Sequence, residues 1–302
     1  MSSDREFENE FSFPYLIRNV DQLPSALSEL VKQYIPEKLA IDGIFVMPQG
    51  LFPRGYRYVL IPIHALIFTN KGVLFLSAST KSGKSAAATW IGTSEILKIK
   101  VSVVLLNAMV EIWGVRDGKN TKITMDYSTV GHRLMLPLVF SLLRNMWSKN
   151  RIISDSLPVD ATFPDFVNTS FSFYNGLTQE AIQPDEKIIG HLFQPEITRP
   201  WMRYFKRRVF PKFIFVLTDK QMIVLQEDLK YKVHHEWLFS FVSLSKISSV
   251  NFEESDDLIK IAIRHKQGDE FGGIDLMIEP SQADEWRRME GILLRCGVGV
   301  KR

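Results

Sequence analysis

The sequence predicts an α+β protein made of two copies of one small domain, each an antiparallel sheet or partial barrel closed by a C-terminal helix. Three observations support this prediction. The chain has 302 residues, which is two domains' worth at roughly 150 residues each. Short apolar segments recur at a nearly constant offset along the chain. Each of the two halves then ends in a pattern typical of an amphipathic helix.

The clearest repeat is a pair of apolar runs around a short turn. Residues 66–76 match residues 215–225, and the turns contain Thr-Asn-Lys and Thr-Asp-Lys, respectively. Two β-branched-rich runs around such a turn predict a hairpin in each copy. Asn70 or Asp219 would supply side-chain hydrogen bonds there and tolerate a positive φ. Further matches begin at Pro36 and Pro184, and small loop insertions account for the slight drift in offset.

Three segments predict helices. The second copy ends with an apolar stripe that Ser281 would cap, with Asp284 three residues later; the stripe consists of Trp286, Met289, Ile292 and Leu293. The first copy ends with a helix over about residues 128–147, which Pro137 should kink or restart. Residues 22–34 predict a short amphipathic helix that packs on the first domain.

Several short strands followed by one closing helix, twice over, resemble the tandem arrangement of bacterial pleckstrin-homology-like (PH-like) domains. The resemblance covers about residues 36–150 and 184–296 and carries no catalytic signature. The predicted organisation is an N-terminal extension with a short helix, a first PH-like domain, a linker rich in Pro, Ser, Thr, Asn and Asp, and a second PH-like domain, at 1–35, 36–150, 151–178 and 179–302. The resemblance implies a binding or scaffolding protein.

Composition and charge restrict the classes of partner and compartment. The formal net charge is only +3, so we expect no nucleic-acid partner held by global charge, although a local basic patch is possible. The one cysteine, Cys296, excludes an intrachain disulfide framework and fits a reducing compartment. The first ten residues do not resemble a signal peptide, and no apolar run approaches the roughly 20 residues of a membrane span. We expect a cytoplasmic protein, with peripheral membrane contact as one option.

A basic and aromatic segment at residues 199–212 is the main candidate site. It holds six cationic and four aromatic residues and no acidic residue. Cations with interleaved aromatics suit anionic phospholipid headgroups, or an acidic protein partner with Arg and Trp as anchors. The aromatics could instead face the core while the cations stay solvated. The candidate residues are Arg199, Trp201, Arg203, Lys206, Arg207, Arg208 and Lys212.

A second candidate lies at residues 78–85, which satisfy a loose Walker A pattern with alanine in place of the first glycine. A true P-loop needs a long helix directly after it, whereas only residues 86–91 separate Ser85 from Gly92. We therefore expect a basic loop between strands, with Lys81 and Lys84 adding to an anion-binding surface. The alternative is a nucleotide-binding protein in which Lys84 contacts the phosphates and Ser85 holds magnesium.

The remaining titratable residues predict no catalysis, cofactor or metal site. His234 and His235 are adjacent, so on a strand they point to opposite faces and cannot hold one ion together. The acidic residues at 253–257 are expected in a solvated turn. No serine, histidine and acid occur in a recognisable catalytic pattern. We therefore expect a protein that is not an enzyme.

Overall fold

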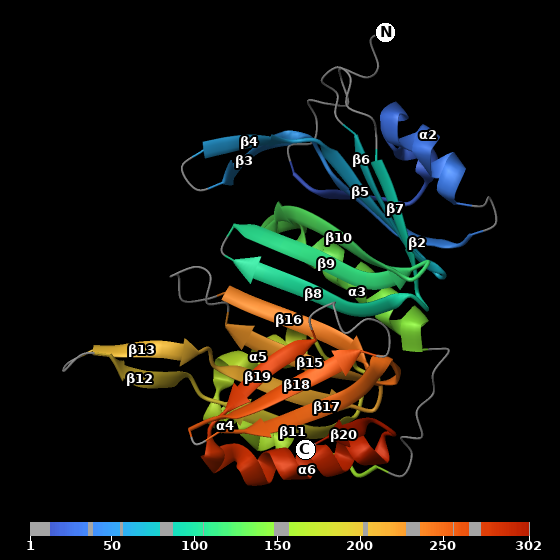
Figure 1. Ribbon diagram of the computed structural model, residues 1–302. Coiled ribbons are helices and arrows are strands. Elements are labelled where there is room, and N and C mark those ends of the chain that lie inside the picture. Colours follow the sequence, from blue (N-terminus) through green and yellow to red (C-terminus); the bar gives the residue numbers. More distant parts are fainter. Residues whose placement is uncertain are drawn as a thin grey trace. The chain divides into compact units, whose positions relative to one another are not determined.

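The computed structural model describes residues 13–35, 39–54, 57–78, 87–104, 106–147, 157–201, 205–227, 236–255, 257–265 and 273–301. The chain divides into two compact units, whose strands and helices are labelled in Figure 1. The first unit comprises Met1–Ile96 and Leu105–Met146, and the second comprises Leu97–Val104 and Trp147–Arg302. Strands in mostly antiparallel sheets dominate both units and helices are few, which confirms the predicted α+β class. None of the described sheets closes into a barrel.

The first unit is built on a five-stranded antiparallel sheet. Its strands, in spatial order, are β1 (Tyr15–Ile17), β2 (Ile41–Met47), β5 (Ile63–Thr69), β6 (Gly72–Ala78) and β7 (Ala87–Gly92). Strands β5 and β6 pair from Ile63↔Ala78 to Thr69↔Gly72, so the hairpin predicted around Thr69 is confirmed. Strands β3 (Gly50–Arg54) and β4 (Arg57–Ile61) form a separate two-stranded hairpin.

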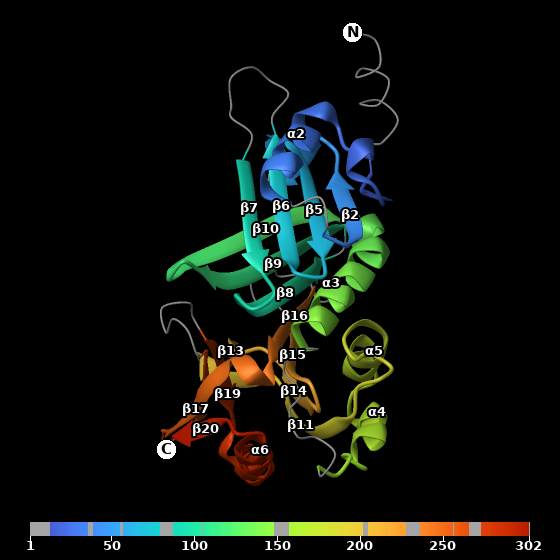
Figure 2. The same cartoon turned by 90° about the vertical axis from the view of Figure 1, so that its right-hand side faces the viewer.

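Both faces of this sheet are covered. Helix α2 (Ser25–Tyr34) follows a short 3-10 turn (Val20–Gln22) and buries Leu27 and Val31 in the core of the sheet, which confirms the expected packing of that helix. Figure 2 shows α2 in front of the strands it covers. On the opposite face, the Phe45 ring lies 5.4 Å from Tyr127 of the hairpin formed by β9 (Asn107–Arg116) and β10 (Lys119–Ser128).

Helix α3 (His132–Trp147) closes the first unit. It begins after a 3-10 turn (Thr129–Gly131), and Pro137 lies inside it without interrupting the helix. Polar contacts fasten the helix to strand β2: the carboxylate of Asp42 accepts hydrogen bonds from Ser141 (2.7 Å) and Asn145 (3.0 Å). Of the two expected effects of Pro137, a kink or a restart, the helix does not restart, because it continues on both sides of the proline.

The main sheet of the second unit includes a strand from the middle of the chain. It consists of β11 (Ile188–Gln194), β14 (Phe213–Thr218), β15 (Gln221–Glu227), β16 (Glu236–Ser243) and the end of β8 (Ile96–Val104). Residues Leu97–Val104 belong to this unit by their contacts. They pair antiparallel with β16, for example at Val101↔Phe239.

A second sheet and a helix complete the core of this unit. The sheet contains β19 (Ile274–Ile278), β18 (Ile259–His265), β17 (Ile247–Glu254) and β20 (Gly299–Lys301), with β20 parallel to β17. Helix α6 (Ala283–Arg295) buries the predicted stripe of Trp286, Met289, Ile292 and Leu293, which confirms that stripe.

The predicted cap of helix α6 is wrong. Ser281 lies within a 3-10 turn (Pro280–Gln282), the helix begins at Ala283, and Gln282 at the N-cap position makes no side-chain capping hydrogen bond. The acidic Glu253 and Glu254 form the end of strand β17 and do not lie in the predicted turn.

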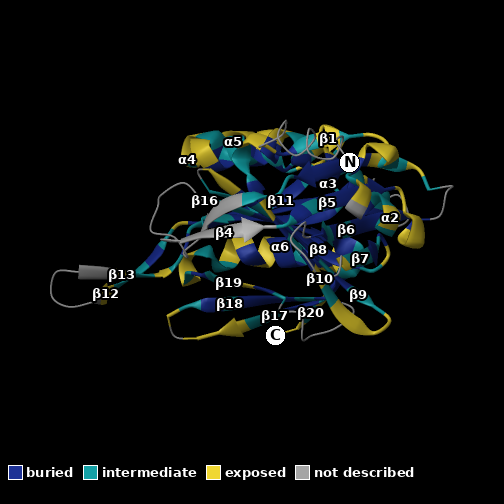
Figure 3. Ribbon diagram, turned by 90° about the horizontal axis from the view of Figure 1, so that it is seen from above, coloured by how far each residue is buried: buried dark blue, intermediate teal, exposed yellow. Residues whose placement is uncertain are grey.

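The segment predicted as a linker carries helical structure where it is described. It contains a 3-10 turn (Phe163–Asp165) and helices α4 (Phe166–Thr169) and α5 (Phe171–Glu180). Phe163, Phe166 and Phe173 are buried, and Figure 3 shows exposed residues on the outer surface of α4 and α5. These helices therefore pack on the second unit through aromatic side chains.

Two local features occur in both units. In the first unit, the Thr69 hydroxyl donates to the Gly72 carbonyl (2.9 Å) and accepts from the amides of residues 71 and 72. The Thr218 hydroxyl makes the same set with Gln221 and residue 220. Neither Asn70 nor Asp219 adopts a positive φ, and the threonine hydroxyls stabilise these turns.

A glycine beneath the closing helix is the second shared feature. A Cβ atom on Gly43 would lie 2.7 Å from Leu138 of α3, and one on Gly190 would lie 2.7 Å from Met289 of α6. Each glycine also follows a bulge, in the β2–β5 and β11–β14 pairs, respectively. The missing side chain lets the helix approach the strand in both units.

Candidate functional site

The basic and aromatic segment folds as a hairpin of the second unit. Strands β12 (Ile197–Trp201) and β13 (Phe205–Phe210) pair only with each other and form a separate two-stranded sheet. Figures 1 and 3 both show this hairpin extending away from the two larger sheets of its unit. We call it the β12–β13 hairpin.

Two of the predicted cations are neutralised by local carboxylates. Arg208 of β13 forms an ion pair with Glu196, with 2.6 Å between nitrogen and oxygen. Lys212, which follows the hairpin, lies 2.5 Å from Glu227 of β15 and 5.5 Å from the centre of the Phe173 ring. These two side chains hold the base of the hairpin to its surroundings.

Arg199 and Arg207 have a different environment. They occupy directly opposite positions of the two strands. Arg199 donates a 2.9 Å hydrogen bond to the carbonyl of Asp257, and Arg207 is exposed. Neither forms an ion pair with a carboxylate in the part of the chain that the structure describes. Like charges directly opposite each other destabilise a strand pair, so this pair favours a bound anion.

The other predicted site residues are described in part or not at all. Arg203, Lys81 and Lys84 lie outside the described residues, and for Trp201 and Lys206 only the backbone is described. The segment that resembles a Walker A motif connects strands β6 and β7, which pair antiparallel. The chain thus continues into a strand at residue 87, where a P-loop would require a helix.

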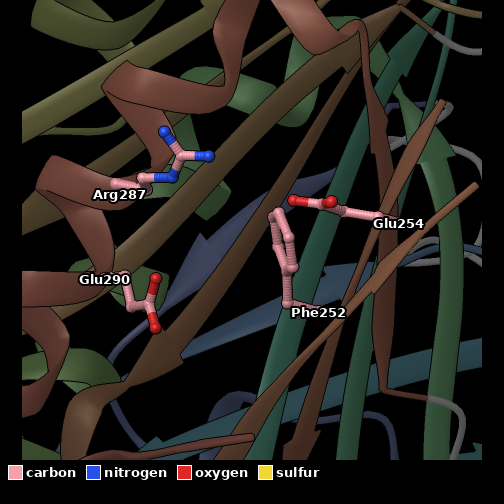
Figure 4. A pocket seen from close by; sticks show the side chains of 4 residues that line it. All are labelled: Phe252, Glu254, Arg287 and Glu290. Atoms are coloured by element: carbon pink, nitrogen blue, oxygen red, sulfur yellow. The ribbon is translucent and has the colours of Figure 1, made fainter. Parts of the chain in front are cut away.

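A pocket of about 290 Å³ lies between strand β17 and helix α6. Its lining combines an aromatic ring, two carboxylates and a guanidinium group, from Phe252, Glu254, Arg287 and Glu290. Figure 4 shows the ring of Phe252 beside the carboxylate of Glu254, both on β17, facing the helix that carries Arg287 and Glu290. The Arg287 guanidinium is bonded to Asp284 one helical turn away (2.8 Å).

This pocket was not predicted from the sequence. Phe252 and Glu254 share a strand face because they are two residues apart, and Arg287 and Glu290 share a helix face because they are three apart. Each spacing is visible in the sequence. What the sequence does not show is that this strand and this helix lie next to each other.

Two buried polar clusters have structural roles. Asp160 lies 2.8 Å from the His191 ring and accepts two hydrogen bonds from Thr162, and the second of these is 2.6 Å long. Burial opposes ionisation of Asp160, but the hydrogen bonds from Thr162 and His191 prevail and lower the pKa of this carboxyl. The cluster joins the segment before α4 to strand β11.

Glu186, which is partly buried, forms the second cluster. It accepts a hydrogen bond from the Gln221 amide (2.9 Å), and burial raises the pKa of Glu186 to about 7. Among the described residues, no three histidine, cysteine or acidic side chains gather as a metal would require. The described helices also include none with the length and apolar character of a membrane span.

Comparisons with known proteins give little further information. No family model matches the chain, and no curated protein matches it. Among solved structures, the chain is similar to the hSac2 domain from human phosphoinositide phosphatase Sac2, with 13% sequence identity over 46% of this chain and 90% of that chain. The TM-score is 0.28.

Proposed function

We propose that the protein is a non-catalytic binding protein made of two PH-like domains, and that its β12–β13 hairpin binds an anionic membrane surface. The observation that carries the proposal is the opposed pair Arg199 and Arg207, which have no carboxylate partner within the described residues. Each cation near an anionic membrane surface contributes about 1 kcal/mol. Binding to an anionic membrane therefore offsets the repulsion between Arg199 and Arg207.

The order of elements supports two related domains. Each unit contains, in chain order, a strand with a bulge, a separate hairpin, further antiparallel strands and a closing helix. The threonine turns at Thr69 and Thr218 and the glycines at 43 and 190 occupy equivalent places in this order. A single ancestral domain copied once would produce this correspondence.

The shape of the hairpin favours a membrane over an acidic protein. It is a two-stranded ribbon that extends from its unit. The aromatic residues Trp201 and Phe205 pair at the ends of its two strands. Aromatic residues are enriched at membrane–water interfaces. An acidic protein partner would use the same arginines, so the experiment must separate the two.

The test is sedimentation of the full chain with phosphatidylcholine vesicles, with and without phosphatidylserine. We expect binding only to the acidic vesicles, and weakening with added salt. The variant Arg199→Ala/Arg207→Ala should bind about thirtyfold more weakly, because it loses two contributions of about 1 kcal/mol each. The variant Arg207→Ala alone keeps the Asp257 contact and should lose about half of that free energy.

A charge-matched control is available in the same unit. Arg295 and Lys301 are exposed and lie outside the hairpin, so Arg295→Ala/Lys301→Ala changes the net charge equally. It should leave vesicle binding unchanged. If acidic vesicles bind the hairpin variant and the control variant equally well, the hairpin is not the membrane site. If the protein binds no vesicles, the membrane proposal fails and an acidic protein partner replaces it.

A further inference from the structure

The first unit contains a counterpart of the β12–β13 hairpin. Strands β3 and β4 lie between β2 and β5 in the chain, as β12 and β13 lie between β11 and β14, and they form a two-stranded sheet of their own (Figure 1). Arg54 is directly opposite Arg57 in this pairing, as Arg199 is opposite Arg207 in the second unit. For Arg54 and Arg57 the structure describes the backbone. Each unit therefore carries an opposed pair of arginines on a separate hairpin.

The sequence around this first pair lacks acidic residues. Residues 43–94, which include strands β3 to β7, contain no Asp or Glu. Asp42, just before this stretch, accepts hydrogen bonds of 2.7 and 3.0 Å from helix α3, and Glu95, just after it, accepts one of 2.7 Å from the Gly92 amide. Strands β3 to β7 thus supply no carboxylate to the pair. Because like charges directly opposite each other destabilise a strand pair, an anion outside the chain would stabilise this hairpin.

Apolar residues make up most of the rest of this hairpin. Six of the ten residues in β3 and β4 are apolar: Leu51, Phe52, Tyr58, Val59, Leu60 and Ile61. A two-stranded hairpin by itself is only marginally stable in water. Apolar residues gain free energy when they leave water, and Tyr is enriched at membrane–water interfaces. A membrane surface with acidic headgroups therefore suits both the cations and the apolar residues, whereas a dissolved anion would contact only the cations.

We propose that the β3–β4 hairpin is a second membrane-binding site, at which Arg54 and Arg57 contact acidic headgroups and the apolar residues of the two strands enter the interface. The kind of surface rests on the proposed function, whereas the residues belong to the other unit of the chain. The protein then carries two membrane-binding hairpins, and each of them can be tested while the other is impaired.

The experiment starts from Arg199→Ala/Arg207→Ala, in which the β12–β13 hairpin is impaired. This variant should still sediment with phosphatidylcholine vesicles that contain phosphatidylserine. Addition of Arg54→Ala/Arg57→Ala should weaken the remaining binding about thirtyfold, because two further cations near the anionic surface are lost. The comparison holds whether or not the two hairpins reach the same vesicle, because only one of them is intact at the start.

The matched control adds Arg133→Ala/Arg144→Ala to the same starting variant. Both arginines are exposed and belong to helix α3 of the first unit, so the net charge changes equally. This control should leave the remaining binding unchanged. If the two fourfold variants bind acidic vesicles with equal affinity, the β3–β4 hairpin is not a membrane site, and the proposal for the β12–β13 hairpin still stands.

A fluorescent probe tests the β3–β4 hairpin with all its arginines present. In a Cys296→Ser background, an environment-sensitive dye on Tyr58→Cys should gain intensity with acidic vesicles, because that residue enters the interface. The same dye on Asn120→Cys, at an exposed position of β10, should not respond. An unchanged signal at residue 58, with vesicles that the labelled protein binds, would overturn the proposal for this hairpin. A wild-type chain that binds no vesicles would overturn the proposed function, and this second site with it.

Discussion

A single partly buried carboxylate links the turn around Thr218 to pH. Glu186 accepts hydrogen bonds from the backbone of Gln183 and the side chain of Gln221, yet burial outweighs them and raises its pKa to about 7. The unfolded chain has the ordinary value of 4.5. Between these values the folded protein binds more protons than the unfolded chain, so its stability falls as pH rises through this range.

The variant Glu186→Gln should remove this pH dependence of stability. The amide keeps an acceptor for the Gln183 backbone and carries no charge, so it removes the cost of ionising a buried group. Wild type should lose on the order of 2 kcal/mol of unfolding free energy between about pH 4.5 and pH 7 through this residue, and the variant should not. Urea unfolding across that range measures the difference.

Asp185 is the control for this measurement. Asp185 is exposed and pairs with Lys220, which belongs to the turn around Thr218. Asp185→Asn therefore changes the local charge and leaves the Glu186 carboxylate in place. Its pH dependence should follow wild type. Parallel pH profiles for Glu186→Gln and wild type would show that Glu186 does not carry the effect.

At the scale of elements, the closing helices depend on the glycines beneath them. A Cβ atom on Gly190 would lie 2.7 Å from the Met289 sulfur and 2.8 Å from Ile292, and both side chains are buried. Gly190→Ala should therefore destabilise the protein by about 1–3 kcal/mol through overpacking. Thermal and chemical unfolding would both report this loss.

A substitution at Gly291 should have the opposite effect on stability. It lies inside α6, and a Cβ atom there would meet nothing within 4 Å. Gly291→Ala should stabilise the protein by about 0.5–1 kcal/mol, because alanine favours the helix. If both substitutions stabilise, the close approach of α6 to β11 does not constrain residue 190.

The elements also show which parts of the fold a sequence can predict. The hairpins around Thr69 and Thr218 and the stripe of α6 follow from local patterns, and those predictions are confirmed. The cap at Ser281 fails because a 3-10 turn intervenes. The helices of the predicted linker were missed because Pro and Ser suggested a loop, whereas buried phenylalanines hold them in place.

Only the residue types of the candidate site could be predicted from the sequence. The run of cations in the β12–β13 hairpin is visible in the sequence, but the partners that neutralise Arg208 and Lys212 come from residues at different distances along the chain. The acidic Glu196 lies just before the run, and Glu227 lies two strands later. Cross-strand register, which is a property of the folded sheet, separates the paired cations from Arg199 and Arg207.

At the scale of the whole molecule, the sheet of the second unit requires a strand from an earlier part of the chain. Within Leu97–Val104, which belong to this unit, Ile99–Val104 pair along β16, and Ile99 and Val101 are buried. No local pattern predicts this pairing, because its two strands are far apart in the sequence.

This arrangement makes a prediction for a fragment of residues 147–302. Without Leu97–Val104, strand β16 would present an unpaired edge in the fragment, and such an edge promotes association. The fragment should therefore unfold at a lower temperature than the full chain and should associate at higher concentration. A peptide of residues 96–104 should raise its melting temperature in proportion to the logarithm of peptide concentration, because it binds the folded state.

The matched peptide replaces Ile99 and Val101 with Asp, which keeps the length but would bury two charges in the sheet. It should give no stabilisation. A fragment whose melting temperature is the same with and without either peptide would show that the second unit closes its sheet by itself. In that case the strand Leu97–Val104 would be dispensable to the unit, and the edge of β16 would have to be protected by its own residues.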